Sequence, residues 1–547
     1  MNNLIYIILF LSKNLKDSLI KIFKTQEYKN ELMEKYLEKN LKLWERNFDK
    51  KSKKKILITD FVSTIGYTVL MSIIGKYTSL IKTAKLEAII RQNDMRGEKI
   101  IKSFGVSKFY SIKLDIFFKR LKYFKDAIII TNKAKSVKNF LKIKHKKINI
   151  GLIVYDHILR HAGIEYTRKI NFKFIYFLSI ALDYDNFCKK FFKENKFDYI
   201  IQSETQFIPS AIFFENALLF KNKVLAHEGG TKDVSVRIFK SVSQRFQGRS
   251  LFSEKLYRYV SNQKIKKIKK IATSILNKRF EGKSNSQDLR GAVIAYKPKK
   301  KFSKKDLCNL YGWDPNKPII AIFASDFYDG TFGVPWKAFR DNYEWFSTTI
   351  EIVKKLDNIN WLIKKHPIEN SKKEHTKIFD YINNISKYKN NIQIFDDKLN
   401  SGSLIKVIDA LITQSGSAGL EYPCFGIPSI ISSRSYYGGF GFTNETRSIS
   451  AYKILLKKIN KFGSKKLIVN KSKALTYFYL CFYVSKTSIP LVPPFDLTRN
   501  LKDNEFWRDM NKLANSYVIK KDYFLHCFKK QLSGNFRHTL NYKKLRD

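Results

Sequence analysis

The stretch Ala410-Leu-Ile-Thr-Gln-Ser-Gly-Ser-Ala-Gly-Leu-Glu421 decides the fold, because it joins three kinds of local structure. Ala410–Thr413 is a short apolar run and predicts a buried strand. The small residues that follow predict a tight turn, and Ala418–Glu421 is expected to open a helix. A strand that leads through such a turn into a helix is the repeating step of a parallel α/β sheet.

The same step recurs on both sides of this stretch. Pro318–Ala324 is a continuous apolar run, as expected for a strand that is buried on both faces. Further strands are predicted at 360–364, 391–395 and 427–431, and a helix is predicted at 339–353 from its apolar spacing. These elements predict a Rossmann-like domain over residues 318–450.

A second alternation precedes the first along the chain. Strands are predicted at 55–60, 86–90, 197–202 and 223–226, and a helix at 68–80. The fold class is therefore predicted to be α/β with two Rossmann-like domains and extra N- and C-terminal helices. The predicted boundaries are an N-terminal helical segment (1–50), an N-terminal Rossmann-like domain (51–285), a basic linker (286–317), a C-terminal Rossmann-like domain (318–450) and a mostly helical extension (451–547).

The composition excludes some classes of protein. The 547 residues include 103 Lys and Arg against 48 Asp and Glu, a net charge of +55. With 44% hydrophobic and 15% aromatic residues, the chain is not intrinsically disordered. The positive charge is spread along the chain, and no nucleic-acid recognition motif accompanies it, so nucleic-acid binding is disfavoured. A phosphate-bearing substrate or an anionic membrane surface fits the charge better.

The cysteines and the N-terminal residues indicate where in the cell the protein is expected. The five cysteines are widely spaced and form no CxxC pair, so neither a disulfide framework nor a metal site is expected. The apolar run 4–11 is too short to span a bilayer. It is either a packed helix or an interfacial anchor with Lys13 and Lys16 at the headgroups. A cytoplasmic protein, peripheral on the inner face of the cell membrane, is expected.

The turn after the 410–413 strand is the best candidate for binding a phosphate. Ser415, Gly416, Ser417 and Ala418 would present backbone N–H groups at the start of a helix, and the two serines add hydroxyl donors. Glu421 would accept hydrogen bonds from a ribose. In the alternative interpretation, a serine merely caps the helix and Glu421 complements the helix dipole.

Other candidate side chains follow neighbouring strands of the same domain. His366 and Pro367 end the 360–364 strand, and the imidazole could donate to a phosphate oxygen. Asp326 follows the 318–324 strand and could contact sugar hydroxyls or simply shape a turn. Gly439 and Phe440 belong to a Gly-rich segment that would let a ligand approach closely, although such segments also serve ordinary loop packing.

A general base is expected from the N-terminal domain. Glu228 is attractive because it ends a strand and precedes two glycines, and Asp60 ends the first strand of its domain. The remaining carboxylates and imidazoles considered for this role are Asp156, Glu204 and His227.

The combination of His366-Pro367, Thr413–Glu421 and Gly426-Ile-Pro428 resembles the C-terminal domain of GT-B glycosyltransferases. It is most similar to bacterial surface-carbohydrate and capsule biosynthesis proteins. The His-Pro and paired-serine motifs look like those of Kdo and sialic acid transferases. That resemblance implies that His366, Ser415 and Ser417 hold the donor phosphate, and that the two domains face each other across a cleft. The acidic-Gly motif that carries the base in some sialyltransferases has no counterpart at a matching position.

The resemblance implies a metal-independent glycosyltransferase with a nucleotide-sugar as co-substrate and no other cofactor. The donor would be CMP-Kdo or sialic-type, or an NDP-sugar. The acceptor would be a capsule or lipopolysaccharide glycan, or a lipid-linked glycan. The 413–421 segment is also similar to UDP-sugar 2-epimerases, and a polyol phosphate transferase of the same fold is a further alternative. A basic nucleic-acid-binding protein or a scaffold protein is the alternative from another class.

Overall fold

The computed structural model describes residues 30–45, 52–112, 117–162, 164, 166–228, 233–247, 252–262, 265–283, 296, 299–328, 330, 332–334, 337–366, 376–494 and 503–546. The chain divides into two compact units. Unit 1 comprises residues 1–162, 167–244 and 487–539, and unit 2 comprises residues 163–166, 245–486 and 540–547. The N-terminal run 4–11, a candidate membrane anchor, lies outside the described residues.

Each unit is built on a six-stranded sheet. The strand order is β3-β2-β1-β4-β5-β6 in unit 1 and β12-β11-β10-β7-β8-β9 in unit 2. Numbered along each unit, both orders read 3-2-1-4-5-6 from one edge, which is the order of a Rossmann fold. All neighbouring strands run parallel except β5 and β6. The predicted α/β class with two Rossmann-like domains is confirmed.

The elements of unit 1 come from three parts of the chain. They are α2 (Glu31–Glu45), β1 (Lys55–Asp60), α3 (Ile65–Lys82), β2 (Lys85–Ile90), α4 (Met95–Lys102), β3 (Lys108–Ser111), α5 (Phe117–Ala134), α6 (Val137–Phe140), α7 (Ile150–Ala162), α8 (Phe172–Glu194), β4 (Tyr199–Ile201), α9 (Ser210–Leu219), β5 (Lys223–Glu228), β6 (Ser235–Phe239), the 3₁₀ turn η1 (Val242–Gln247) that runs across the boundary of unit 1, α19 (Asp503–Ser516), η7 (Ile519–Lys521) and α20 (Tyr523–Ser533).

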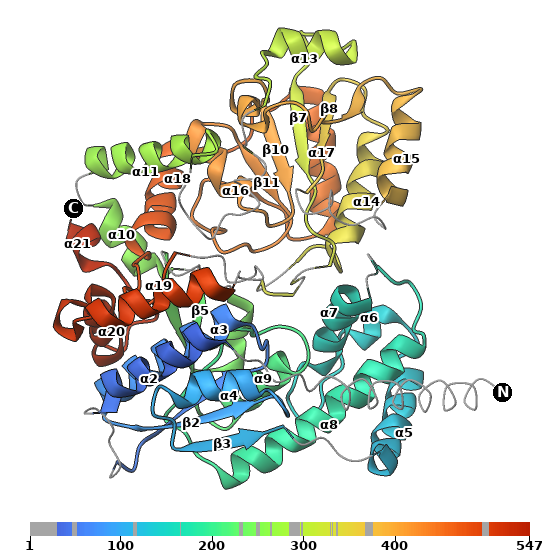
Figure 1. The fold of residues 1–547 in the computed structure, drawn as a ribbon. Coiled ribbons are helices and arrows are strands. Elements are labelled where there is room, and N and C mark those ends of the chain that lie inside the picture. Colours follow the sequence, from blue (N-terminus) through green and yellow to red (C-terminus); the bar gives the residue numbers. More distant parts are fainter. Residues whose placement is uncertain are drawn as a thin grey trace. The chain divides into compact units, whose positions relative to one another are not determined.

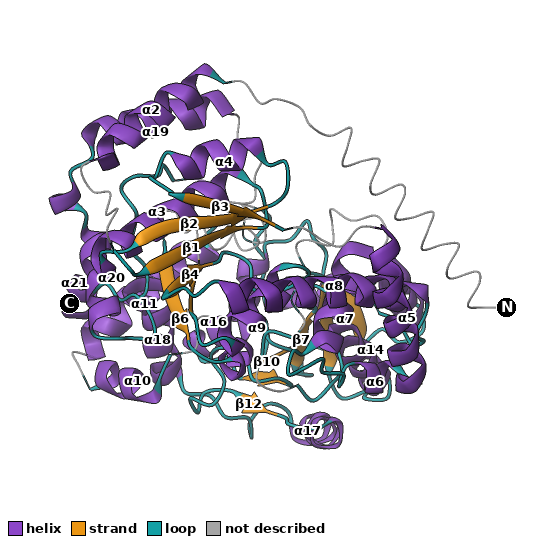
Figure 2. Ribbon diagram, turned by 90° about the horizontal axis from the view of Figure 1, so that it is seen from below, coloured by secondary structure: helices purple, strands orange, loops and turns teal. Residues whose placement is uncertain are grey.

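Helices cover both faces of the unit 1 sheet. Figure 2 shows α3 and α4 on one side of β1–β3 and α8 and α9 on the other. Helix α3 is buried over almost its whole length, and Gly75 lets it approach β1 closely. A Cβ atom at Gly75 would lie 2.6 Å from Ile58 Cγ1, so any larger residue would push the helix off the strand.

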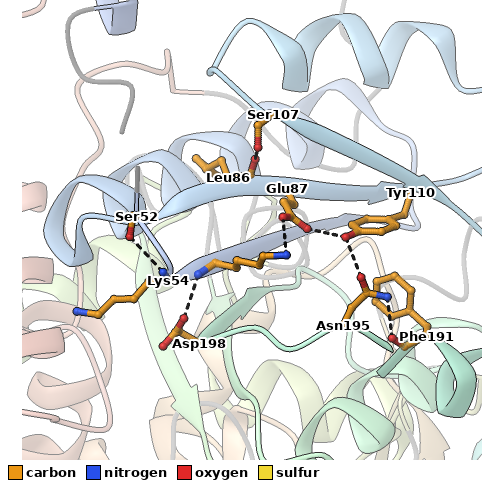
Figure 3. A network of polar contacts seen from close by, with 10 residues as sticks. Ser52, Lys54, Leu86, Glu87, Ser107, Tyr110, Phe191, Asn195 and Asp198 are labelled. Carbon is orange, nitrogen blue, oxygen red and sulfur yellow. Dashed lines mark hydrogen bonds and ion pairs between the residues drawn. The ribbon is translucent and has the colours of Figure 1, made fainter. Parts of the chain in front are cut away.

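A polar network ties the edge of this sheet to α8 (Figure 3). Glu87 of β2 is buried, and its carboxylate accepts from Tyr110 Oη at 2.6 Å and pairs with Lys55 Nζ at 3.1 Å. Tyr110 Oη also lies 3.0 Å from Asn195 Oδ1, at the C-terminus of α8. Because a buried carboxylate needs both a charge partner and hydrogen bonds, this network fixes β1, β2 and β3 against the helix.

Helices α19 and α20 belong to unit 1 rather than to a separate extension. Figure 1 shows α19 and α20 (red) beside α2 and α3 (blue), and Trp507 of α19 packs in the same core as Tyr36 of α2. Tyr77 of α3 donates a hydrogen bond to Asp522, which caps α20. Residues 487–539 therefore complete the N-terminal unit, which differs from the predicted C-terminal extension at 451–547.

Unit 2 contains the remaining elements. They are α10 (Glu254–Ser261), α11 (Ile265–Phe280), α13 (Lys304–Tyr311), β7 (Ile319–Phe323), α14 (Asn342–Val353), β8 (Asn360–Lys364), α15 (Thr376–Ser386), β9 (Ile392–Ile394), η4 (Ser401–Lys406), β10 (Ala410–Thr413), α16 (Ala418–Glu421), η5 (Pro423–Phe425), β11 (Ser429–Ile431), β12 (Asn444–Glu445), α17 (Ile449–Phe462), α18 (Lys471–Tyr479), the π-helical turn η6 (Leu480–Val484) and α21 (Tyr542–Arg546).

Two apolar cores lie on opposite faces of the unit 2 sheet. One contains residues of α14, α15 and α17, and the other contains residues of α11, α16 and α18. Helices α10 and α11 thus lie in unit 2, although the predicted N-terminal domain extended to residue 285. Helix α13, within the predicted linker 286–317, also belongs to unit 2. Among the helices of the described residues, none is both long and apolar enough to cross a bilayer.

Candidate functional site

Both sheets reverse their strand order at a point where ligands bind in Rossmann folds. In unit 2 this switch point lies between β7 and β10, and in unit 1 between β1 and β4. In open α/β sheets, the loops that follow these strands at their carboxyl ends form the crevice in which ligands bind. The predicted phosphate-binding turn follows β10, so the topology places it at the switch point of unit 2.

The turn after β10 is partly exposed and rests on buried residues. Thr413 and Gln414 are buried, whereas Ser415–Ala418 are partly exposed. A Cβ atom at Gly416 would lie 2.9 Å from Thr413 Oγ1, so glycine keeps this turn close to the strand. Helix α16 is only one turn long and continues as a 3₁₀ turn. Its dipole is therefore small, and hydrogen-bond donors of the loops must carry any anion binding.

Ser417 stands at the N-cap of α16, but its side chain makes no capping hydrogen bond within the described residues. The capping interpretation of this serine is therefore not what the structure shows. Its hydroxyl is left for a ligand or solvent.

The loop after β11 braces the turn. Ser433 Oγ donates to the Gln414 carbonyl at 2.7 Å, and Tyr437 Oη donates to the Gly416 carbonyl at 2.6 Å. Gly419 makes the second contact possible, since a Cβ atom there would lie 2.1 Å from Tyr437 Oη. These two hydrogen bonds hold the turn in one position relative to the β11 loop.

Arg434 lies in the same loop, over the Gly-rich segment. A Cβ atom at Gly439 would lie 2.3 Å from Arg434 Nη2, and Gly439 has φ of 84°. Gly439 therefore provides a flat, side-chain-free surface under the guanidinium. Among the carboxylates that the structure describes, none forms an ion pair with Arg434, although Glu445 Oε1 lies near the same glycines and accepts a hydrogen bond from the Gly439 amide.

Several buried polar atoms around this point lack hydrogen-bond partners within the described structure. On the loops after β7, β10 and β11 they include Gln414 Nε2 and Oε1, Ser432 Oγ, Arg434 Nε, Ser325 Oγ and Asp326 Oδ2. Gln414 and Ser432 are fully buried. Buried polar atoms are almost always hydrogen-bonded, and leaving one unsatisfied costs about 1–3 kcal/mol. A cluster of such atoms on three adjacent loops marks a place where a polar ligand or ordered water supplies the missing bonds.

The loop after β7 is the third loop at this edge of the unit 2 sheet, beside the loops after β10 and β11. Asp326 Oδ1 accepts from the Tyr328 amide at 2.9 Å, so this carboxylate shapes its own turn, and its Oδ2 is buried without a hydrogen-bond partner among the described residues. The Ala338 amide donates to the Ser432 carbonyl at 2.8 Å. The β7, β10 and β11 loops are thus linked by hydrogen bonds into one framework.

His366 lies two residues beyond the end of β8 and is partly buried. Strand β8 is the neighbour of β7 on the side away from β10. Pro367, expected to direct the chain at this point, lies outside the described residues.

Glu421 has a different position from the one expected. Its Oε1 accepts from Arg279 Nη2 of α11 at 2.7 Å, and the two side chains are only 2% and 3% exposed. The carboxylate is therefore engaged inside unit 2 and is not presented to a ribose. The physical reason is the distant helix α11, which the local sequence around Glu421 does not reveal.

Phe440 also serves packing. It is buried, with its ring centroid 4.4 Å from that of Tyr477 and 5.0 Å from that of Tyr257. It is not an exposed platform for a base or sugar. Gly439 is exposed and lies beside Arg434.

In unit 1, Asp60 ends β1 and is 2% exposed. Its Oδ1 accepts from the Ser63 amide at 2.9 Å, and its Oδ2 accepts from the Thr68 hydroxyl. Burial raises the pKa of Asp60 to about 6, partly opposed by these hydrogen bonds. Asp60 thus fixes the loop between β1 and α3.

Two other base candidates lie at the end of β5. The backbone of Glu228 pairs with Ser235 of β6, and its side chain lies outside what the structure describes. His227 is buried, and its ring centroid lies 5.5 Å from that of Tyr67, in the first turn of α3. The topology therefore brings the ends of β1 and β5 near the start of the same helix.

Two residues of the unit 2 cluster, Ser432 and Arg434, were not predicted from the sequence. Both follow the predicted 427–431 strand closely, at the same sheet edge as the β10 turn, and this position could have identified them. The sequence pattern indicated the glycines that follow, including Gly439, but not Arg434, which lies against Gly439.

Comparison with known proteins gives distant similarity. No protein-family model and no curated protein matches the sequence. Among solved structures, the chain is similar to a β-Kdo 2,7 transferase, KpsC of Thermosulfurimonas dismutans (14% identity, TM-score 0.30, covering 68% of this chain and 97% of that one). It is also similar to a glycosyltransferase of Rickettsia africae ESF-5 (11% identity, TM-score 0.28, covering 85% of this chain and 100% of that one). A third similar structure is UDP-GlcNAc 2-epimerase of Neisseria meningitidis (10% identity, TM-score 0.24, covering 78% of this chain and 95% of that one).

At these identities and TM-scores, the likeness concerns fold alone, and the fold assignment rests on the two strand orders. What the structure itself shows is two Rossmann-like units in one chain.

Proposed function

We propose that the chain is a glycosyltransferase of the GT-B type that binds a nucleotide-sugar donor at the carboxyl edge of the unit 2 sheet. The observation that carries the proposal is the cluster of buried polar atoms without partners around Gln414, Ser432 and Arg434. The donors among them, which are Gln414 Nε2, the Ser432 hydroxyl and the Arg434 guanidinium, suit the oxygens of a phosphate group. Their place at the topological switch point suits a nucleotide.

Each part of the site has a proposed role. The Ser415–Ala418 turn and the serine hydroxyls would donate hydrogen bonds to the phosphate. Arg434 would neutralise the charge that grows on the departing nucleotide, and His366 would donate to it or protonate it. Stabilisation of the leaving group lowers the barrier because the new negative charge meets donors that are already in place.

On the acceptor side, we propose Glu228 as the general base, with Asp60 as a positioning residue for the loop between β1 and α3. Both oxygens of Asp60 already accept hydrogen bonds from that loop, which favours the positioning role. The proposed acceptor is a bacterial surface polysaccharide of the capsule or lipopolysaccharide kind, or its lipid-linked precursor. This choice rests on the resemblance of the His366 and Ser415–Ser417 motifs.

The first test is thermal stabilisation of the full chain by CMP, CDP, UDP and GDP. A ligand at 100 times its dissociation constant should stabilise the protein by about 2.7 kcal/mol. Arg434→Gln and His366→Ala should each weaken binding of the nucleotide that stabilises the parent. Arg447→Gln is the matched control, since Arg447 is an exposed arginine of the same unit. Stabilisation by none of these nucleotides would overturn the donor site.

A second experiment separates transfer from epimerisation. The nucleotide-sugar that matches the stabilising nucleotide is incubated with the protein in D₂O and followed by NMR. Release of free nucleotide, with sugar passed to an acceptor or to water, supports a transferase. Exchange of the proton at C2 of UDP-GlcNAc without release of UDP would establish the epimerase instead.

A further inference from the structure

One segment of unit 2 is basic throughout and carries no acidic residue. Between Arg447 and Lys473 the sequence has nine Lys and Arg and neither Asp nor Glu. The segment contains α17, the turn that follows it, and the start of α18.

Helix α17 has two different faces. Tyr452, Leu456 and Ile459 are fully or almost fully buried in the core that covers one face of the sheet. The opposite face exposes four lysines together with Ile454, whose exposed fraction is 55%. These lysines are Lys453, Lys457, Lys458 and Lys461. Figure 2 shows α17 end-on, near β12 at the edge of the unit 2 sheet.

The turn after α17 exposes two more aliphatic side chains. Ile468 is 58% exposed and Val469 is 39% exposed. The backbone of Ile468 is held by Asn444 of β12 through two hydrogen bonds of 2.8 Å, one to its carbonyl and one from its amide. The outward position of these side chains therefore belongs to the folded sheet edge and not to a loose loop. We call Lys453, Ile454, Lys457, Lys458, Lys461, Lys465, Lys466, Ile468 and Val469 the basic helix-turn surface.

The charges of this surface are largely uncompensated. Lys453, Lys457, Lys458 and Lys465 form no ion pair with any carboxylate that the structure describes. Lysines alone would suit any polyanion, including nucleic acid. Three exposed aliphatic side chains among them are a poor match for a phosphate backbone but suit a bilayer interface, where apolar side chains enter the boundary of the acyl chains and lysines meet the headgroups.

We propose that the basic helix-turn surface docks unit 2 on a bilayer that contains anionic lipids. The lysines lie at the lipid phosphates, and Ile454, Ile468 and Val469 enter the interface. The inference does not depend on the donor site. It would keep the protein where a lipid-linked acceptor is held.

The experiment is flotation of the full-length protein with vesicles of phosphatidylcholine alone or with 30% phosphatidylglycerol. The parent should bind the anionic vesicles and not the neutral ones, and binding should weaken as salt is raised. Each lysine near an anionic surface contributes about fivefold in affinity. The triple variant Lys453→Glu, Lys457→Glu, Lys458→Glu should therefore bind at least about 100-fold more weakly.

Two further variants keep the proposal falsifiable despite the high net charge. Lys138→Glu, Lys142→Glu, Lys144→Glu makes the same charge change on exposed lysines of unit 1, and it should lose far less affinity. Ile454→Ser, Ile468→Ser, Val469→Ser keeps the charge and should still lose about tenfold or more, because it removes the inserted apolar area. Residues 1–29 are the same in every variant, so the differences report this surface.

Equal losses in the two lysine variants would overturn the proposal, because binding would then follow net charge alone. Parent-like binding by the serine variant would also overturn it. Duplex DNA that displaces the protein from vesicles, with the serine variant unaffected in DNA binding, would assign the surface to nucleic acid. Unchanged thermal unfolding of each variant shows that the losses do not come from misfolding.

Discussion

The ion pair between Arg279 and Glu421 predicts a large loss of stability when one partner is removed. Arg279 Nη2 lies 2.7 Å from Glu421 Oε1, and both side chains are almost completely buried. The guanidinium also lies over the Phe482 ring, 5.4 Å from its centroid. Substitution of Glu421 by Ala would leave this cation buried without a carboxylate.

The magnitude follows from the burial of the pair. Breaking a buried ion pair by removing one partner costs about 3–5 kcal/mol, because the remaining charge is desolvated and uncompensated. In a unit of about 250 residues, each kcal/mol lowers the midpoint of thermal unfolding by about 2–4 °C. Glu421→Ala should therefore lower the midpoint of unit 2 by on the order of 10 °C.

The assay is thermal and urea unfolding followed by circular dichroism, with nucleotide titration on the same samples. Glu281→Ala is the matched control in unit 2, because Glu281 and Lys283 form an exposed pair at 3.2 Å. Such surface pairs contribute only about 0–1 kcal/mol. The double variant Arg279→Met, Glu421→Leu should recover most of the lost stability, since apolar pairs of similar volume often replace buried ion pairs without cost.

Two results would refute the predicted role of this ion pair. If Glu421→Ala unfolded like the parent but lost nucleotide affinity, the carboxylate would contact the ribose, as the local sequence suggested. If the double variant were as unstable as the single one, the loss would come from shape and not from unpaired charge.

Three further predictions concern Asp60 and the β10 turn. Burial raises the pKa of Asp60 from 3.8 to about 6, so the folded state binds this proton more tightly than the unfolded chain does. The free energy of unfolding should then fall by up to about 3 kcal/mol as pH rises from about 4 to about 6. Urea titrations at several pH values should show that this fall is missing in Asp60→Asn. If the free energy of unfolding changed equally with pH in both proteins, the prediction would be contradicted. Gly419→Ala should lower stability by about 1–3 kcal/mol in the same titrations, because its Cβ atom would meet Tyr437 Oη at 2.1 Å, and a parent-like midpoint would show that the loop yields freely. Tyr437→Phe removes the 2.6 Å hydrogen bond to the Gly416 carbonyl, so the free energy of unfolding should fall by about 1 kcal/mol. Nucleotide affinity, measured by calorimetry, should fall several-fold. Unchanged affinity would show that this hydrogen bond does not support the donor site.

Much of the sheet architecture was predictable from local pattern. Strands predicted at 360–364 and 410–413 coincide with β8 and β10, and the apolar run at 318–324 contains β7. Strands buried on both faces are short runs of apolar residues between turn residues, and this pattern needs no knowledge of distant contacts. The position of Ser415–Ala418 at a sheet edge followed from the same pattern.

The helical parts were harder to predict. Helices α5, α7 and α8 fill most of residues 117–194, where periodicity predicted no element. Helix α8 buries residues on several faces, so its sequence lacks the single apolar stripe that identifies an amphipathic helix. The two compact units differ from the predicted domain boundaries for a related reason, since the helices at 503–516 and 523–533 pack against α2 and α3 at the other end of the chain.

The sequence by itself determined the class of the fold, most strands of both sheets and the turn most suited to a phosphate, because each of these depends on residues that are close along the chain. Only the tertiary structure decided which charged side chains near that turn are paired inside the fold. Glu421 meets Arg279 across 142 residues and is withdrawn into the core, whereas Arg434 lies against Gly439 in the loop after β11. Contacts at such separations leave no local pattern, because the energy of a buried charge depends on what the fold places beside it.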